Sequence, residues 1–547
     1  MLLSAAAPAR DKVLPSLHSR TARPQLERPK DVPPDAELEG AQARIGEIRI
    51  QPRNIFDADR PDENTALFRL ANRLHIRTHV STVKDQLLFQ SGDVYQARLL
   101  AESERILRGT RYIQDATILP VAYHDGVVDV EAITHDVWTL NPGISFGRTG
   151  GKSTSGFKLE ELNLLGLGSQ ISLGRKSGVD RTSTTLRYSD PQLFGSWWTL
   201  TAGHSDNSDG KTDELNIEHP FYALDTQRAV GLSGVKDQRV DSLYDLGEVT
   251  DQYGVQQRRA TLYGGWSSGL RNGWVRRITA GFTYDDSQFM RVVGETGPTT
   301  LLPRDRKLSY PWLGYEWIQD DFEKARNRDQ IEKTEDVQLG LRAKVQAGYA
   351  AASFGSDRNA VVFNAGVSRG FEPGERQRLL LATTLAGRQE GGTLTDTVAG
   401  ISARYYLRQS NRRLLFLSTV ADVGTNLDLD HPLLLGGDNG LRGYPLRYQG
   451  GKGRWLMTAE QRYFTNWFPF RLFNVGGAVF YDMGRTWGDN PSGTRSQGML
   501  KDVGFGLRLG NSRSALGNVL HIDLAFPLDG GRSIDKLQFL VETQRSF

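Results

Sequence analysis

Several short patterns in the sequence contain residues that act as nucleophiles or metal ligands in enzymes, but each lacks a part that the chemistry requires. The pattern G-x-S-x-G occurs three times, around Ser145, Ser267 and Ser368. A nucleophile elbow needs a helix directly after the serine, and no helix is predicted after any of the three. His75 and His79 lie four residues apart, but Ile76 stands where a zinc-protease helix needs glutamate. We therefore predict no enzyme, no metal site and no cofactor.

Two loops have the residue types of ligand-binding sites. The stretch TGGKSTSG (149–156) resembles a phosphate-binding loop, but that loop needs a glycine five residues before Gly151, where this chain has Phe146. We interpret this stretch as a hairpin turn. The stretch NLDLDH (426–431) offers carboxylate and imidazole ligands for a cation at the cell surface, and a solvated loop is the interpretation that we favour.

A loop arginine and two strand carboxylates near the C-terminus suggest an ion pair. In GGAVFYDMG, period-two alternation separates one face, Val475, Gly477, Val479 and Tyr481, from the other, Gly476, Ala478, Phe480 and Asp482. The same count places Thr458, Glu460 and Arg462 on an inward face. Arg442 lies in the glycine-rich stretch LLLGGDNGLRGYPLRYQGG (433–451), and Gly443 beside it permits close backbone approach. We predict a bidentate ion pair between Arg442 and these carboxylates.

The energetic weight of this pair depends on its surroundings. In a dry site, losing one partner costs about 3–5 kcal/mol, whereas in a watery lumen the pair contributes under about 1 kcal/mol. The sequence leaves both regimes open. It also leaves open that Asp482 and Glu460 are ordinary solvated residues of a porin lumen.

The elements that position these residues are predicted to be the strands of a barrel. The chain of 547 residues has 38% hydrophobic and 24% charged residues, and it lacks any run of about twenty apolar residues that would span a bilayer as a helix. After Asn141-Pro142 segments of period two recur, separated by Gly, Asn, Asp and Ser clusters. The 59 glycines and frequent aromatic residues suit many short strands with an apolar outside. A net charge of +3 gives no reason to expect nucleic acid, and zero cysteines exclude disulfides.

The alternation is clearest in the last three segments. The residues predicted to face lipid are Val503, Phe505, Leu507 and Leu509, then Leu520, Ile522, Leu524 and Phe526. The terminal segment KLQFLVETQRSF alternates Leu537, Phe539, Val541 and Thr543, and it ends on Phe547. We interpret Phe539, Val541 and Phe547 as a terminal-strand signal, with the last ring at the membrane boundary.

The chain is predicted to divide into three parts. Residues 1–40 are Pro-rich and are expected to be a disordered leader, the remnant of an export signal. Residues 41–140 read as a β-α-α-β-β module, with a helix that ends at Gly109 and a hairpin turn at Asp125-Gly126. Residues 141–547 are predicted to form a transmembrane antiparallel β-barrel. At about 20–25 residues per strand and connection this gives 16 to 20 strands, of which we choose 16.

Several motifs together resemble the BamA/TamA superfamily of outer-membrane assembly and translocation barrels, also called the bacterial surface antigen family. In that family a long loop folds back into the barrel and presents a Leu/Val-Arg-Gly-Phe/Tyr tip, here Leu441, Arg442, Gly443 and Tyr444. The resemblance implies an acidic partner in an F-x-D-x-G strand, here Phe480, Asp482 and Gly484, and an inward glutamate, here Glu460. NLLGLG (163–168) and SDPQLFG (189–195) look like its early-strand elements, and the α+β module looks like a POTRA domain.

The resemblance implies a function in the outer membrane of a Gram-negative bacterium, with the POTRA-like domain in the periplasm. The expected role is to assemble, insert or translocate polypeptides: the small domain captures unfolded outer-membrane or secreted clients and the barrel seam templates their insertion. The expected surroundings are the lipid bilayer with its lipopolysaccharide, and periplasmic accessory proteins. A two-partner secretion pore for a dedicated exoprotein and a passive porin-like barrel are the alternatives. Only one POTRA-like module is evident, and Arg545 stands where a second terminal aromatic is often found.

Overall fold

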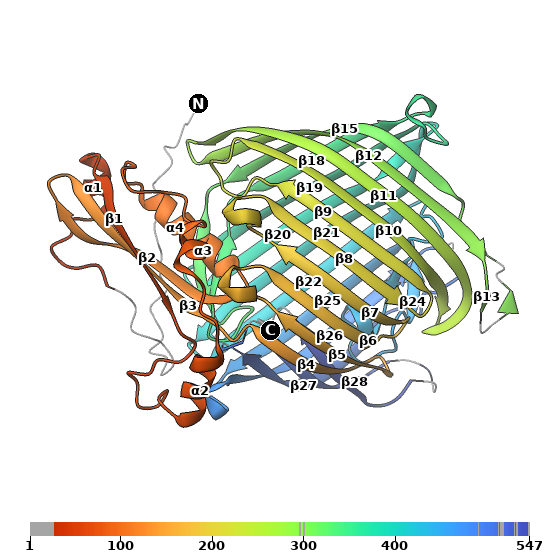
Figure 1. Ribbon diagram of the computed structural model, residues 1–547. Coiled ribbons are helices and arrows are strands. Elements are labelled where there is room, and N and C mark those ends of the chain that lie inside the picture. The colour runs from red at the N-terminus through yellow and green to blue at the C-terminus, as the bar shows by residue number, and fades with distance from the viewer. Residues whose placement is uncertain are drawn as a thin grey trace.

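The computed structural model describes residues 27–544, apart from 295–296, 299–300, 491, 512, 515–518, 530 and 532–533. Most of the predicted leader and Phe547 therefore lie outside the described residues. A small α+β domain lies against one end of a large barrel (Figure 1). We call this end of the barrel proximal and the opposite end distal. In the part of the chain that is described, no helix has the length and hydropathy needed to cross a bilayer.

The small domain is a three-stranded sheet packed against helices. Its elements are α1 (Asp35–Gly40), β1 (Arg44–Arg53), α2 (Ala66–Leu74), α3 (Val80–Lys84), α4 (Ala97–Gly109), β2 (Ile113–His124) and β3 (Val127–Asp136). The strand order is β1-β3-β2, with β1 parallel and β2 antiparallel to β3. Asp125 and Gly126 both have positive φ, as a tight two-residue hairpin turn requires.

Two details of the small domain differ from the sequence prediction. Helix α1 lies inside the segment predicted to be a disordered leader, because Leu38 is fully buried in the domain core together with Val32. The small domain therefore begins before residue 41. The short helix α3 was also not predicted, since its five residues are too few to show a helical period.

The barrel is closed and antiparallel, and its strands follow one another around the wall in chain order. They are β4 (Leu140–Thr149), β5 (Lys152–Glu161), β6 (Gln170–Ser177), β7 (Thr182–Asp190), β8 (Thr199–Asn207), β9 (Gly210–His219), β10 (Arg228–Asp245), β11 (Glu248–Arg271), β12 (Trp274–Arg291), β15 (Arg306–Gln319), β18 (Arg342–Ala350), β19 (Ala360–Gly374), β20 (Gln377–Glu390), β21 (Thr393–Ser410), β22 (Arg413–Thr425), β25 (Gly453–Phe464), β26 (Phe473–Trp487), β27 (Leu500–Asn511), β28 (Val519–Pro527) and β29 (Gln538–Gln544).

The predicted count of 16 strands is wrong, because the closed barrel contains 20. The estimate assumed too much chain per strand. The six strands β4 to β9 are only 8–10 residues long and most are joined by short turns, so this part of the chain fits more strands than the estimate allowed. Because this number is even, β4 begins and β29 ends at the same, proximal end of the barrel.

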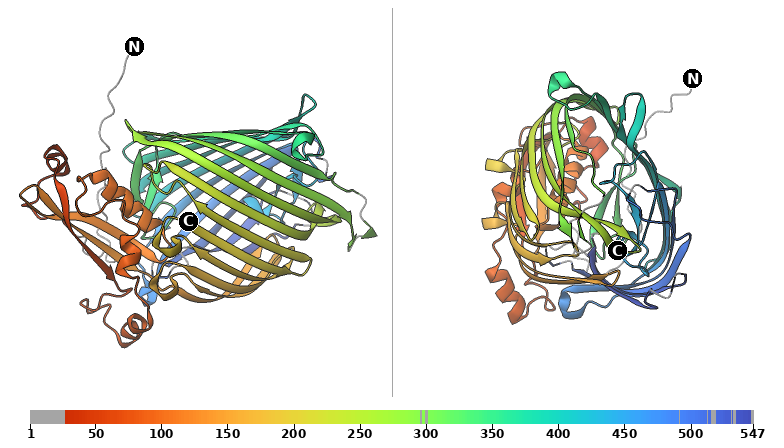
Figure 2. Two further views of the ribbon diagram at one scale, coloured as in Figure 1. Left: turned by 45° about the horizontal axis from the view of Figure 1, so that its top comes forward. Right: turned by 90° about the vertical axis from the view of Figure 1, so that its right-hand side faces the viewer.

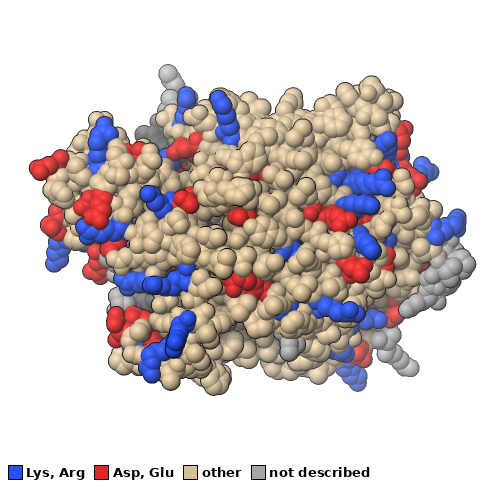
Figure 3. Space-filling model, viewed as in Figure 1, with Lys and Arg blue, Asp and Glu red and all other residues tan. Residues whose placement is uncertain are grey.

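The wall separates an apolar outside from a polar inside. Exposed outward residues include Phe157, Leu173, Leu186, Leu262, Leu313, Ile401, Val479 and Phe505. Figure 3 shows charges gathered over the small domain and towards the distal end, and a mostly uncharged surface between them. Alternation in β27 and β28 is as predicted: Phe505, Leu507 and Phe526 are exposed, whereas Asp502, Arg508 and Asp523 are buried. This distribution is that of a barrel that spans a membrane.

Val475 departs from the predicted alternation. It is buried, although the neighbouring outward residue Val479 is exposed. Its backbone hydrogen bonds join it to Thr465 and Trp467, so the turn before β26 lies against it. Alternation in sequence does not predict such local cover by a turn.

Candidate functional site: the occupied lumen and the seam

The connection between β22 and β25, residues 426–452, folds from the distal end into the barrel. Within it β23 (Leu433–Leu435) and β24 (Gln449–Gly451) pair with each other. Leu441 and Tyr444 are fully buried in a cluster with Leu435, Tyr448 and Leu500. The apolar cluster holds the loop against the wall and leaves Arg442 at its tip.

Arg442 lies among carboxylates of β25, β26 and β28. Its Nε and Nη2 donate to the two oxygens of Asp482 at 2.7 and 3.0 Å, and its Nη1 donates to Glu460 at 3.1 Å. Asp523 lies 3.6 Å from Nη1. The guanidinium also stacks over Phe480, 3.3 Å from the ring centroid. The sequence-predicted residues Arg442, Asp482 and Glu460 are thus brought together.

The two glycines of the motif allow close approach, and the tyrosine anchors the tip. The Gly443 N–H donates to Asp502 at 3.0 Å, and a Cβ at Gly443 would lie 2.6 Å from the Asp502 Cβ. The Tyr444 hydroxyl donates to the Lys501 carbonyl at 2.7 Å. Gly484 does not contact the tip. A Cβ there would lie 2.9 Å from Leu435, so Gly484 makes room for β23 instead.

Burial selects between the two regimes that the sequence left open. The Asp482 side chain is 0% exposed, Glu460 is 5% exposed and Arg442 is 14% exposed. Charges this buried are poorly screened, so removing one partner leaves an uncompensated charge. The dry regime, with its larger cost, applies to this pair.

Three further charged residues of the site, Asp502, Arg508 and Asp523, were not singled out from the sequence, whereas Arg462 was placed on the inward face. Asp502, Arg508 and Asp523 are buried on β27 and β28, and Arg508 pairs with Asp523. Arg462 donates its Nε to Glu460 at 2.9 Å. Their inward positions follow from the same period-two count, so the alternation of β27 and β28 was a usable signal. Their partners depend on the neighbouring strands and on the loop that enters the barrel.

A second element occupies the lumen from the proximal end. The connection between β15 and β18 forms a hairpin of β16 (Phe322–Arg326) and β17 (Thr334–Gln338). Its tip contacts wall strands far along the chain: Arg462 donates to the Arg328 carbonyl at 2.6 Å, and Ile331 packs with Tyr406 and Phe464. We call residues 322–338 the lumen hairpin.

The lumen hairpin is also tied to the small domain. Arg108 of α4 makes a bidentate pair with Asp336, at 2.8 and 2.7 Å, and Lys324 lies 2.7 Å from Glu104. Inside the barrel, Arg378 pairs with Glu323 at 2.6 Å. The small domain, the lumen hairpin and the barrel wall are therefore joined by buried or half-buried ion pairs.

Within the described part of the chain, the seam between the first and last strands is the least paired junction of the wall. There β29 and β4 share one register pair, Val541 with Arg148. By contrast β4 and β5 share ten pairs, from Leu140 with Glu161 to Thr149 with Lys152. A side-chain hydrogen bond between Thr149 and Glu542 adds to the seam. Phe539 and Val541, the described residues of the predicted terminal signal, both lie on this last strand.

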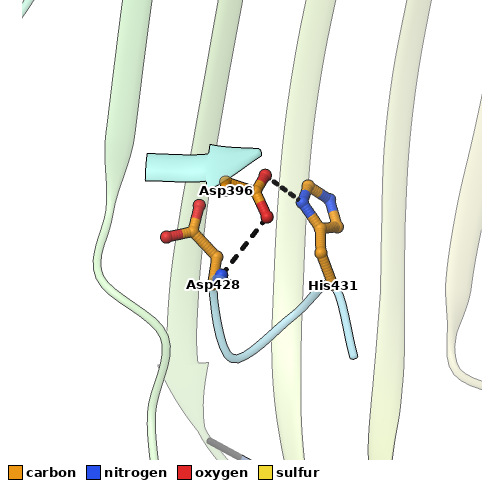
Figure 4. A group of neighbouring side chains, drawn as sticks. All are labelled: Asp396, Asp428 and His431. Atoms are coloured by element: carbon orange, nitrogen blue, oxygen red, sulfur yellow. Dashed lines mark hydrogen bonds and ion pairs between the residues drawn. The ribbon is translucent and has the colours of Figure 1, made fainter. Parts of the chain in front are cut away.

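The acidic loop NLDLDH lies at the distal end and is neutralised by arginines. Figure 4 shows Asp396 between His431 and the backbone of Asp428. Asp396 accepts from the His431 imidazole at 2.6 Å and from the Asp428 N–H at 3.2 Å. Arg388 lies 2.6 Å from Asp428 and 3.3 Å from Asp396. A cation would compete with this guanidinium for the same oxygens, so the geometry favours a charge-balanced loop.

No protein-family model matches the chain, and no curated protein matches it. Three solved structures are similar to it. BamA from Haemophilus ducreyi lacking POTRA domains 1-3 is 14% identical with a TM-score of 0.39, over 92% of this chain and 85% of that one. CdiB from Acinetobacter baumannii is 13% identical (TM-score 0.42, 92% and 73%), and CdiB from Escherichia coli is 14% identical (TM-score 0.47, 93% and 77%). At these identities and TM-scores the likenesses carry no functional argument.

Breaking the Arg442–Asp482 pair should destabilise the barrel strongly. We expect Arg442→Ala and Asp482→Ala each to lower the free energy of unfolding by about 3–5 kcal/mol, measured by urea unfolding in micelles. The double variant should be little worse than either, because the two residues act as a pair. Arg447→Ala is the matched control, since its half-exposed pair with Asp180 should contribute under about 1 kcal/mol. Additive losses would contradict the pairing.

Removing the lumen hairpin should open the barrel to ions. We expect replacement of residues 324–336 by a short turn to raise single-channel conductance in planar bilayers, because the hairpin lies across the proximal end of the lumen. A Cβ on Gly510 would lie 2.9 Å from that of Ile331, so Ile331→Cys with Gly510→Cys should form a disulfide after a small shift. The oxidised variant should stay at low conductance. Equal conductance of the deletion and the parent would show that the hairpin does not close the lumen.

The His431 contact should depend on pH. The hydrogen bond to the Asp396 carboxylate, aided by Asp430, raises the pKa of His431. Because the folded-state pKa is raised, the contact stabilises the loop fully below the ordinary histidine pKa and is lost as the pH rises through the raised value. NMR of isotopically labelled histidine should show Asp396→Asn lowering this pKa, and millimolar calcium leaving it unchanged. A calcium-induced shift would instead indicate a cation site.

Proposed function

We propose that the protein assembles, inserts or translocates polypeptides at a bacterial outer membrane. The observation that carries this proposal is that, among the described residues, β29 and β4 share a single register pair, whereas every other pair of neighbouring wall strands shares at least seven. The small domain then lies in the periplasm, and the distal end faces the cell exterior.

The physical basis is the shortage of hydrogen-bond partners in lipid. Backbone groups along β4 and β29 that do not pair with each other have no water to bind in the hydrocarbon region. An incoming client strand that pairs with them removes that cost, so the seam acts as a template. Folding of the client supplies the free energy, and no nucleotide is needed.

The small domain offers an edge for capturing extended clients. In the sheet order β1-β3-β2 the outer edge of β2 pairs with no other strand among the described residues. An extended polypeptide adds to such an edge by backbone hydrogen bonds, largely independent of its sequence. Capture at β2 therefore suits unfolded clients with different sequences.

A secretion pore is the second candidate, and the lumen hairpin is the observation that favours it. The lumen hairpin fills the proximal lumen and is bound to the small domain through Arg108 and Asp336. In a secretion pore, cargo that binds to the small domain would move the hairpin and so open the passage. A passive porin is disfavoured, because the Arg442 loop and the lumen hairpin both occupy its lumen.

Photocrosslinking from the seam tests the proposal. A photoreactive residue at Phe539 in living cells should capture nascent outer-membrane proteins. The matched control adds Arg148→Cys and Val541→Cys, a register pair in a chain without cysteine, so that oxidation locks the seam. Capture that disappears on oxidation supports insertion at the seam. Capture of one secreted protein that survives oxidation would favour the pore, and capture of lipid alone would contradict both.

A further inference from the structure

Helix α2 carries apolar residues on two sides, and only one side is packed. Phe68 is buried and stacks on Phe56, with ring centroids 4.1 Å apart. On the other side Leu67, Leu70 and Leu74 are 67%, 52% and 64% exposed. Residues spaced by three and four form one stripe along a helix. We call these three residues the leucine stripe.

The helix is fixed to the barrel rather than free in solution. Leu472, in the turn between β25 and β26, packs against the Phe56 and Phe68 cluster. Just before α2, Asp62 lies 3.1 Å from Arg471 of the same turn, and Glu63 lies 2.5 Å from Arg513. The orientation of the leucine stripe is therefore set by the proximal rim of the wall.

Helix α2 lies beside the barrel wall and not under the lumen. Figure 1 places α2 at the lower end of the small domain, next to the proximal edge of the wall, and the right-hand view of Figure 2 shows it at the outer margin of the barrel. The same rim carries Trp467, Phe470 and Phe194, which are 63%, 80% and 95% exposed. Aromatic residues at this level of a membrane barrel lie at the lipid headgroups. Helix α2 thus lies beside the rim at which the lipid-facing surface of the wall ends.

The charge of the helix points to the same partner. Arg69 and Arg73 are exposed on α2, and the helix contains no acidic residue. A short amphipathic helix with leucines on one side and arginines beside them binds a membrane surface through the acyl boundary and the phosphates. Binding of a polypeptide would not require the helix to lie at the level of the aromatic rim, whereas binding of lipid does.

We propose that α2 is an interfacial helix that binds the phospholipid surface on the proximal side of the membrane. The leucine stripe enters the boundary between headgroups and acyl chains, and Arg69 and Arg73 bind phosphates. The contact holds the small domain at a fixed angle to the membrane plane. The proposal rests on the barrel spanning a membrane and does not depend on whether polypeptides pass through it.

Site-specific fluorescence tests the lipid contact in the full-length protein. Leu70→Cys introduces a single labelling site, because the chain has no cysteine. In vesicles of phosphatidylethanolamine and phosphatidylglycerol, we expect an environment-sensitive label there to be quenched by spin-labelled phospholipid and shielded from iodide. His124→Cys, at the exposed end of β2, is the control, and its label should be quenched by iodide alone.

A second variant makes the result specific to the stripe. Leu67→Glu and Leu74→Glu, added to the Leu70→Cys protein, alter only exposed side chains, so the barrel should fold and keep its heat-modifiable migration. Lipid quenching at position 70 should fall to the level of the control. Iodide quenching at position 70 in the unmodified stripe would overturn the proposal, and so would shielding from both quenchers, which would indicate a polypeptide on the stripe.

Discussion

A guanidinium buried in a barrel lumen must remain paired with carboxylates, because an unpaired buried charge costs several kcal/mol. Arg442 is held by Asp482 in a bidentate pair, by Glu460 and by the ring of Phe480. If Arg442 moved away from these groups but stayed inside the lumen, the guanidinium and the carboxylates would both be buried without a partner. Positions of the loop between the paired state and full exit into water are therefore unfavourable. The close approach at Gly443, the pairing of β23 with β24 and the apolar cluster around Leu441 and Tyr444 hold the loop in the position where this contact forms.

The same carboxylates connect the loop to the rest of the molecule. Glu460 binds both Arg442 and Arg462, and Arg462 reaches the tip of the lumen hairpin. At the base of that hairpin Asp336 binds Arg108 of the small domain. Ion pairs and a rigid hairpin therefore run from the distal loop to the proximal domain. Displacing the hairpin would change the partners of Arg462 and thus the charge balance around Glu460.

Outside the wall the bilayer replaces water as the solvent, and this changes what counts as a stable surface. The leucine stripe of α2 and the rim aromatics would be unfavourable in water, but they match the interface of a membrane. The seam, with a single register pair among the described residues, differs from these surfaces, because lipid offers no other hydrogen-bond partner to a backbone group that does not pair there. The first kind of surface suits the membrane interface, and the second is where we propose that a client strand pairs.

The sequence by itself determined the features that depend on local period and spacing. Alternation predicted the barrel, the inward positions of Asp482 and Glu460 and the outward positions of Phe505 and Phe526, because neighbouring residues of a strand point to opposite faces. Only the tertiary structure decided the rest. The strand number depends on turn lengths and register around the whole wall, the pairing of Arg462 with the lumen hairpin joins segments far apart in the chain, and the burial that makes the Arg442 pair strong depends on how completely both elements fill the lumen.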